Sequence, residues 1–121
     1  IVAQEDAADA AGDRAAAIRL SGEFHRALVR LAGNPVLLRF LDDLLPTTSL
    51  LLALYQPGPG RACAAHHHRA LLAALDGRAA GAAAEMRRHL AEIERSLSAN
   101  GAAPTPSLRD LFAPYRESVS R

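Results

Sequence analysis

Lysine and tryptophan are absent from this chain of 121 residues, and aromatic residues of every kind are few. Each basic residue is therefore an arginine, and the arginines are interspersed with acidic residues to give a formal net charge of +1. Domains that bind nucleic acid usually concentrate their basic residues in one stripe. The sequence has no such stripe, so we do not expect this chain alone to recognise DNA.

The chain also lacks disulfide partners and long apolar runs. Cys63 is its single cysteine, which excludes an intramolecular disulfide. No apolar run approaches the roughly 20 residues of a membrane-spanning helix, and the N-terminus shows no signal-peptide pattern. We therefore expect a cytoplasmic protein without a membrane partner. Because Ile1 is not an initiator methionine and the chain opens inside a helical pattern, we also expect upstream sequence to be missing.

Alanine and leucine are abundant, and half of the chain is hydrophobic, which is enough for a core in one domain. Both residues are strong helix formers, whereas β-branched residues are scarce. The composition therefore predicts an all-α protein. Because the segments with helical spacing are joined by short connections, we expect an antiparallel helical bundle of five to six helices.

Capping residues divide the chain into helices. Asp13 is a good N-cap, and the run Gly33-Asn34-Pro35 provides a helix end, an N-cap and a first helical residue in succession. The expected helices cover 1–11, 14–32, 35–45, 63–75, 78–99 and 108–119. We assign 1–100 to a bundle truncated at its N-terminus, 101–106 to a loop, and 107–121 to a short helix that packs on the bundle.

Proline 46 is expected to kink or restart the helix that begins at Pro35. The inner face of that helix is predicted to consist of six apolar residues, namely Leu37, Leu38, Phe40, Leu41, Leu44 and Leu45. The segment 50–55 is apolar on all sides, so it is expected to be buried or to lie at an interface.

Three histidines fall on apolar stripes of three separate helices. His25 follows Ser21 by one turn on the inner face of 14–32, and His89 lies on the stripe of 78–99. On 63–75 the stripes that contain His67 and His68 are nearly equally apolar, so periodicity does not choose between them. His66 is expected to be solvated.

A buried histidine is more often a core residue bonded to a carbonyl than a ligand. Three of them on inner faces are costly unless they share a purpose, because buried polar groups need partners. Neutral imidazole is a common ligand of zinc and nickel, and three imidazoles leave a coordination position open. A second possibility is that Cys63 and His67, one turn apart, form half of a metal site.

The ordered set SGEFHRALVRLAGNP, LLALY, HHRALLAAL and AAAEMRRHLAEIERSL resembles the C-terminal effector-binding domain of GntR-type bacterial transcription regulators, the all-helical class called FCD. The resemblance covers about residues 10–97. It implies an antiparallel helical bundle that usually dimerises and a divalent metal bound by an acidic residue and three histidines. The effector is typically a small carboxylate that can touch the metal.

Carried over onto this chain, the resemblance assigns His25, His68 and His89 as metal ligands. Many members have Asp or Asn where this chain has Ser21, so the fourth ligand is expected to be water or the effector. The N-terminal winged-helix DNA-binding domain of such regulators is absent here, so DNA is a partner only through that missing part.

The leading hypothesis is therefore a sensor and not an enzyme: a small organic acid binds at zinc or nickel inside the bundle and shifts a homodimer. Hydroxyl groups expected to help hold the carboxylate belong to Ser21, Thr47, Thr48 and Ser49. One alternative is a zinc-dependent hydrolase, although no acidic residue lies on the histidine stripes to act as a general base. The other is a metal-free dimerisation module.

Overall fold

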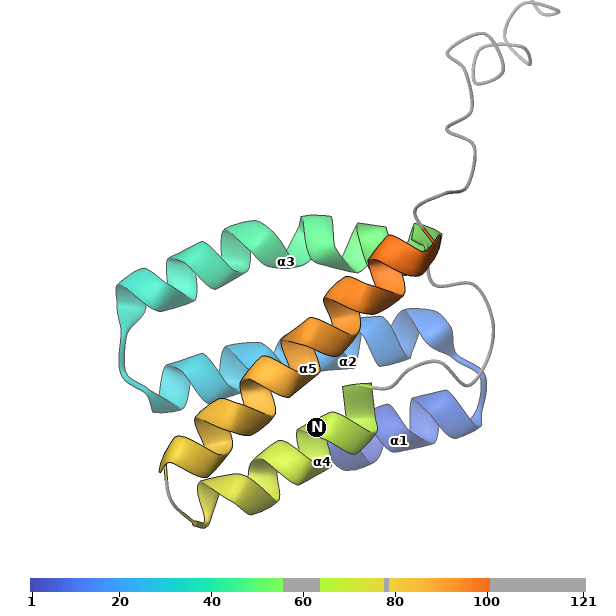
Figure 1. The fold of residues 1–121 in the computed structure, drawn as a ribbon. Coiled ribbons are helices and arrows are strands. Elements are labelled where there is room, and N and C mark those ends of the chain that lie inside the picture. The colour runs from blue at the N-terminus through green and yellow to red at the C-terminus, as the bar shows by residue number, and fades with distance from the viewer. Residues whose placement is uncertain (56–63, 78, 101–121) are drawn as a thin grey trace, which may run out of the picture.

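The computed structural model describes residues 1–55, 64–77 and 79–100, and these residues form helices and turns only. The five helices are α1 (Val2–Ala10), α2 (Arg14–Leu31), α3 (Pro35–Tyr55), α4 (Ala64–Leu75) and α5 (Ala79–Asn100). Consecutive helices run in opposite directions, and α5 crosses diagonally over α2 (Figure 1). The prediction of an all-α helical bundle is confirmed.

The expected capping residues begin and end the helices around α2. Asp13 accepts a hydrogen bond from the backbone N–H of Ala16 at 3.0 Å and so caps α2. Gly33 has φ of +67°, the left-handed conformation that glycine adopts at a helix end. Asn34 then accepts hydrogen bonds from the backbone N–H groups of Val36 and Leu37 at 3.1 and 3.0 Å. Local chemistry therefore fixes the reversal from α2 to α3.

The prediction that Pro46 restarts the helix is wrong, because α3 continues through this residue to Tyr55. A proline inside a helix frees the carbonyl four residues earlier, which here belongs to Asp42. Both residues are exposed, so water can bond that carbonyl and the helix need not end. The result is one helix that carries residues 41–52 along a single wall.

Half of the residues predicted to form the inner face of α3 are exposed. Leu38, Leu41 and Leu45 are partly buried, whereas Leu37, Phe40 and Leu44 are 47%, 63% and 62% exposed. The apolar segment after Pro46 is also largely open, with Leu50, Leu51 and Leu54 exposed. No residue of α3 is fully buried. A long apolar face of this helix is therefore left uncovered by the other described residues.

The core is small and lies between α1, α2, α4 and α5. One cluster joins Ala8 of α1 to Ala17 and Leu20 of α2, and a second joins Phe24, Leu71 and Ala82. Neighbouring helices pack in the pairs α1–α2, α2–α3 and α4–α5, with further contacts of α4 to α1 and α2 and of α5 to α3. Within the described residues, α2 and α5 make no close backbone contact. The space between these two helices holds the site described below.

Several expectations fall on residues that the structure does not describe. They include the loop at 101–106, the short helix within 107–121, and the side chain of Cys63. Among the described helices, none is both long and apolar enough to cross a membrane.

Candidate metal centre and adjoining cavity

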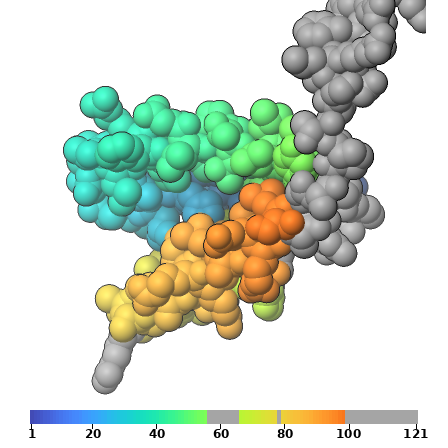
Figure 2. Space-filling model, turned by 45° about the horizontal axis from the view of Figure 1, so that its top comes forward, coloured from blue at the N-terminus to red at the C-terminus, as the bar shows by residue number. Residues whose placement is uncertain are grey.

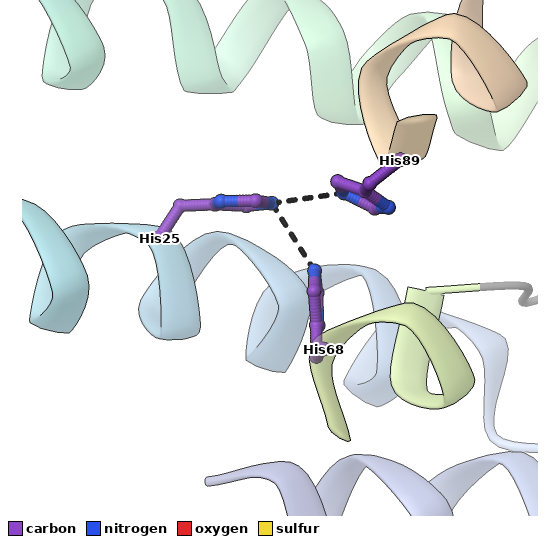
Figure 3. A group of neighbouring side chains, drawn as sticks. All are labelled: His25, His68 and His89. Carbon is purple, nitrogen blue, oxygen red and sulfur yellow. Dashed lines mark hydrogen bonds between the residues drawn. The ribbon is translucent and has the colours of Figure 1, made fainter. Parts of the chain in front are cut away.

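Three imidazole rings from three helices meet between α2, α4 and α5. His25 Nε2 lies 3.2 Å from His68 Nε2 and 3.3 Å from His89 Nε2. One ligand atom from each ring lies within 4.8 Å of the other two. Figure 3 shows the rings pointing toward one another from their separate helices. The structure therefore brings together the three histidines that the sequence predicted, and it places His68, not His67, among them.

The spacing of the nitrogens suits a tetrahedral metal ion. Zinc–nitrogen bonds of about 2.0–2.1 Å put neighbouring ligand nitrogens about 3.3–3.4 Å apart in a tetrahedron. Two of the three nitrogen pairs, at 3.2 and 3.3 Å, match this edge length. The donor set, three neutral imidazoles, is one that zinc and nickel favour. The residues present therefore fit a divalent metal.

His68 is fixed on its other side by a buried carboxylate. Its Nδ1 lies 2.8 Å from Glu5 Oε2, and both side chains are fully buried. The ring of Phe24 stacks on His68 with 4.1 Å between ring centroids. A neutral His68 that donates its Nδ1–H to Glu5 has only a lone pair at Nε2. That lone pair points at the centre of the three rings, which is the orientation a metal ligand needs.

Glu5 is a candidate site residue that the sequence reasoning missed. It lies on α1, outside the three histidine helices, and its second oxygen has no hydrogen-bond partner among the described residues. The available signal was local: Val2, Glu5 and Ala8 are spaced three residues apart, which puts a carboxylate on the apolar face of this helix. A buried carboxylate calls for a nearby cation or donor, and His68 supplies its one described contact.

Burial keeps the other two rings neutral. Desolvation, with the nearby His68 and His89, lowers the pKa of His25 to about 3. Desolvation, with His68 and His67, lowers the pKa of His89 to about 4, although Glu85 opposes this shift. Both rings are therefore uncharged near neutral pH, and their lone pairs are free for a metal. Buried His89 also has an Nδ1 without a partner.

The two remaining histidines lie outside the cluster. His66 is exposed, as expected. His67 is partly buried, with its ring centroid 5.7 Å from that of His89 and its Nδ1 3.7 Å from Glu85 Oε1. His67 is therefore a neighbour of the site that packs beside His89 and does not belong to the cluster.

A cavity of about 210 Å³ opens beside His25 and His89, between α2, α3 and α5. Figure 2 shows α2, in blue, at the bottom of a furrow between α3 and α5. His68 does not line the cavity, because it approaches the cluster from the α4 side. The described residues that line it are Ile18, Ser21, Gly22, His25, Leu41, Leu44, Leu45, Thr48, Ser49, Leu52, His89, Leu90 and Ile93.

Three of the four predicted hydroxyl groups lie at this cavity. Ser21, Thr48 and Ser49 line it, whereas Thr47 is exposed and does not. Thr47 lies about one third of a helical turn from Thr48, on the outer face of α3. The Thr48 hydroxyl donates to the carbonyl of Leu44 at 3.1 Å, so its remaining capacity is to accept. The hydroxyl groups of Ser21 and Ser49 make no hydrogen bond to another described residue.

Comparison with known proteins identifies one family. The family model of the FCD domain matches residues 1–92, which is most of the chain. No curated protein and no solved structure gives a significant match. The matched range contains α1 to α4, most of α5, Glu5 and all three clustered histidines.

The lowered pKa values of His25 and His89 predict that the metal-free protein loses stability in acid. The unfolded chain takes up protons below about pH 6.5, whereas these buried rings stay neutral down to about pH 4 and 3. The free energy of unfolding is therefore highest above pH 6.5 and falls between pH 6.5 and 4, by up to about 1.4 kcal/mol per pH unit for each histidine.

Urea unfolding of chelator-treated protein at several pH values measures this slope. His89→Leu is expected to reduce the slope of the unfolding free energy against pH by the contribution of one histidine, up to about 1.4 kcal/mol per pH unit. The exposed His66→Leu is expected to leave the slope unchanged. An identical slope in the wild type and His89→Leu would contradict the neutral, buried state of His89.

Proposed function

This chain belongs to the FCD domain family, the C-terminal effector-binding domain of GntR-family regulators, and we propose that it senses a small organic acid at a metal ion held by His25, His68 and His89. The observation that carries the proposal is the convergence of three imidazole nitrogens beside a cavity. Family membership makes the domain a ligand-sensing one; the metal, the acid and the ligand residues are our proposal.

The metal ion, zinc or nickel, would be held by the Nε2 lone pairs and would supply a Lewis-acid position for an anion. His25 and His89 face the cavity, whereas His68 is backed by Glu5. The open side of the cluster is therefore the cavity side. A carboxylate that enters the cavity reaches that side, where Ser21 and Ser49 have hydroxyl protons to donate.

Glu5 would orient His68 for the metal. A carboxylate that accepts the second N–H of a ligating histidine fixes its tautomer and raises its basicity. The metal would in turn give the buried carboxylate a nearby positive charge. These two effects support a metal-bound state over a metal-free dimerisation module. Without the ion, the Nε2 atoms of the three rings would not carry enough protons to hydrogen-bond one another.

A hydrolase is less well supported. Glu5 faces His68 Nδ1, on the side of the ring away from the cluster. No carboxylate side chain lines the cavity among the residues that the structure describes. A metal-bound water there would have no general base beside it. Regulation through a DNA-binding domain elsewhere in a regulator of this family is therefore the role we propose.

The regulator would act as a homodimer through the outer face of α3. Six residues spaced three or four apart share this face: Val36, Phe40, Leu44, Thr47, Leu51 and Leu54. The five apolar ones are all exposed. A contiguous apolar face of this length marks an interface. A second copy of the chain is the proposed occupant, because members of the resembled class usually dimerise.

Metal binding is tested by elemental analysis and zinc titration of protein purified without a histidine tag. We expect about one metal per chain and, at a hundredfold excess over Kd, about 2.7 kcal/mol of added stability. His89→Ala is expected to weaken zinc binding at least a hundredfold, because it removes one of three ligands, whereas the exposed His66→Ala is the matched control. Wild-type protein that carries well below one metal per chain and is not stabilised by zinc or nickel would refute the site.

The role of Glu5 is tested by Glu5→Gln, which keeps a hydrogen-bond acceptor but removes the charge. Zinc Kd is expected to rise about 10- to 100-fold, while the unfolding free energy of the metal-free protein is unchanged or higher. The control is Asp6→Asn, which removes an exposed ion pair with Arg69 between the same two helices. If the role of Glu5 were purely structural, Glu5→Gln would instead lower the unfolding free energy of the metal-free protein and leave the zinc Kd unchanged.

The dimer face is tested by Phe40→Glu, which puts a charge within the apolar stripe on α3. Sedimentation analysis is expected to show a dimer for the wild type and at least tenfold weaker association for the variant. Leu31→Glu is the control, because Leu31 is 84% exposed at the end of α2 and lies outside the stripe. A wild-type monomer, or an unaffected dimer in Phe40→Glu, would rule out this interface.

A further inference from the structure

The walls of the cavity restrict which acids it can accept. Its described lining is mostly aliphatic, from Ile18 on α2, four leucines of α3, and Leu90 and Ile93 on α5. No arginine, aspartate or glutamate lies among the lining residues. Arg14 lies on the same stripe of α2, but its guanidinium donates to the carbonyl of Leu52 and it does not line the cavity. With respect to the described residues, the metal would be the only cation that an acid meets in the cavity.

Hydrogen-bonding capacity inside the cavity is also small. Besides the two imidazoles, Ser21, Thr48 and Ser49 are the only described lining residues with polar side chains. The Thr48 proton is already bonded to the carbonyl of Leu44. Two serine hydroxyls are enough for one carboxylate. A polyhydroxylated acid would bury several hydroxyl groups against leucine without partners, which disfavours its binding.

Charge balance favours an acid with one carboxylate. A divalent ion with three neutral imidazoles carries +2, and the buried Glu5 carboxylate behind His68 reduces the sum to +1. One carboxylate on the metal brings the net charge of the metal, the three imidazoles and Glu5 to zero. A second carboxylate would leave an unpaired negative charge among aliphatic side chains, which is strongly unfavourable.

The size of the cavity sets the size of the acid. Its volume of about 210 Å³ is below the range of about 300–1,000 Å³ of drug-sized pockets. An apolar cavity of about 150 Å³ holds one benzene molecule. The remaining space suits a single carboxylate that extends from the apolar body toward His25 and His89.

We propose that the effector is a monocarboxylate with an apolar body about the size of a benzene ring, its carboxylate on the metal beside Ser21 and Ser49 and its body between α3 and α5. This inference rests on the proposed function and narrows it from small organic acids in general. It excludes sugar acids and dicarboxylates as the preferred ligands of this chain.

Calorimetric titration of zinc-loaded protein with four probes tests the inference. The probes are benzoate, the dicarboxylate glutarate, the hydroxylated acid gluconate, and uncharged benzyl alcohol. Benzoate is expected to bind at least tenfold more tightly than each of the others, and to lose at least tenfold in affinity in chelator-treated protein. Equal or tighter binding of gluconate or glutarate would overturn the inference and leave the metal-anchored acid sensor intact.

Two further results separate failure of the inference from failure of the function. If no acid binds to zinc-loaded protein, or if benzoate binds equally without metal, both the proposed function and the inference fail. If benzoate binds through the metal but its apolar body does not occupy the cavity, the wall variant Leu41→Asn will bind it as the wild type does, which overturns the inference alone. We expect Leu41→Asn to weaken benzoate about tenfold with an unchanged zinc Kd, whereas Leu50→Asn on the same helix changes neither, because Leu50 is exposed and lies outside both the cavity lining and the apolar stripe.

Discussion

The contact between Glu5 and His68 is the interaction on which the rest of the site depends. It joins α1 to α4 through two fully buried polar groups, and His68 in turn meets His25 of α2 and His89 of α5 at their nitrogens. Because α2 and α5 make no close backbone contact in the described part of the chain, the contact between His25 and His89 joins two helices whose backbones stay apart. A core built largely of alanine and leucine has little surplus stability for unpaired polar groups. The polar centre must therefore be satisfied from within, and a metal ion would occupy the three Nε2 lone pairs that face one another.

The two sides of this centre differ, and the difference suits a sensor. The α1–α4 side is closed by Glu5, Phe24 and Leu71, whereas the α3 side opens to the cavity. Helix α3 has two roles because it walls the cavity and also carries the exposed apolar stripe. Leu44 belongs to both surfaces. An acid that binds preferentially to one position of α3 would shift the geometry of a dimer formed through that helix, since coupling requires unequal affinity for two states.

The sequence predicted the features that local chemistry determines. Asp13, Gly33 and Asn34 fix helix ends through hydrogen bonds and φ values within a few residues, and helical period placed His25 and His89 on inner faces. The choice of His68 over His67 needed the family resemblance, because the two stripes are nearly equal in sequence. Features set by distant packing were missed. Glu5 is separated from His68 by 63 residues, so no local pattern links them. The exposed side of α3 depends on which neighbouring helices cover it, and a segment that is apolar on all sides does not indicate which side that is.

Ser21 and Glu5 together give the site its particular character. Many members of the resembled class have Asp or Asn at the position of Ser21. Here the position has a hydroxyl that lines the cavity, and the buried carboxyl group of Glu5 lies behind His68. Without an Asp or Asn ligand on the cavity side, one coordination position of the proposed metal would stay open. That position faces the aliphatic walls of α3 and α5, so the effector carboxylate itself would complete both the coordination and the charge balance.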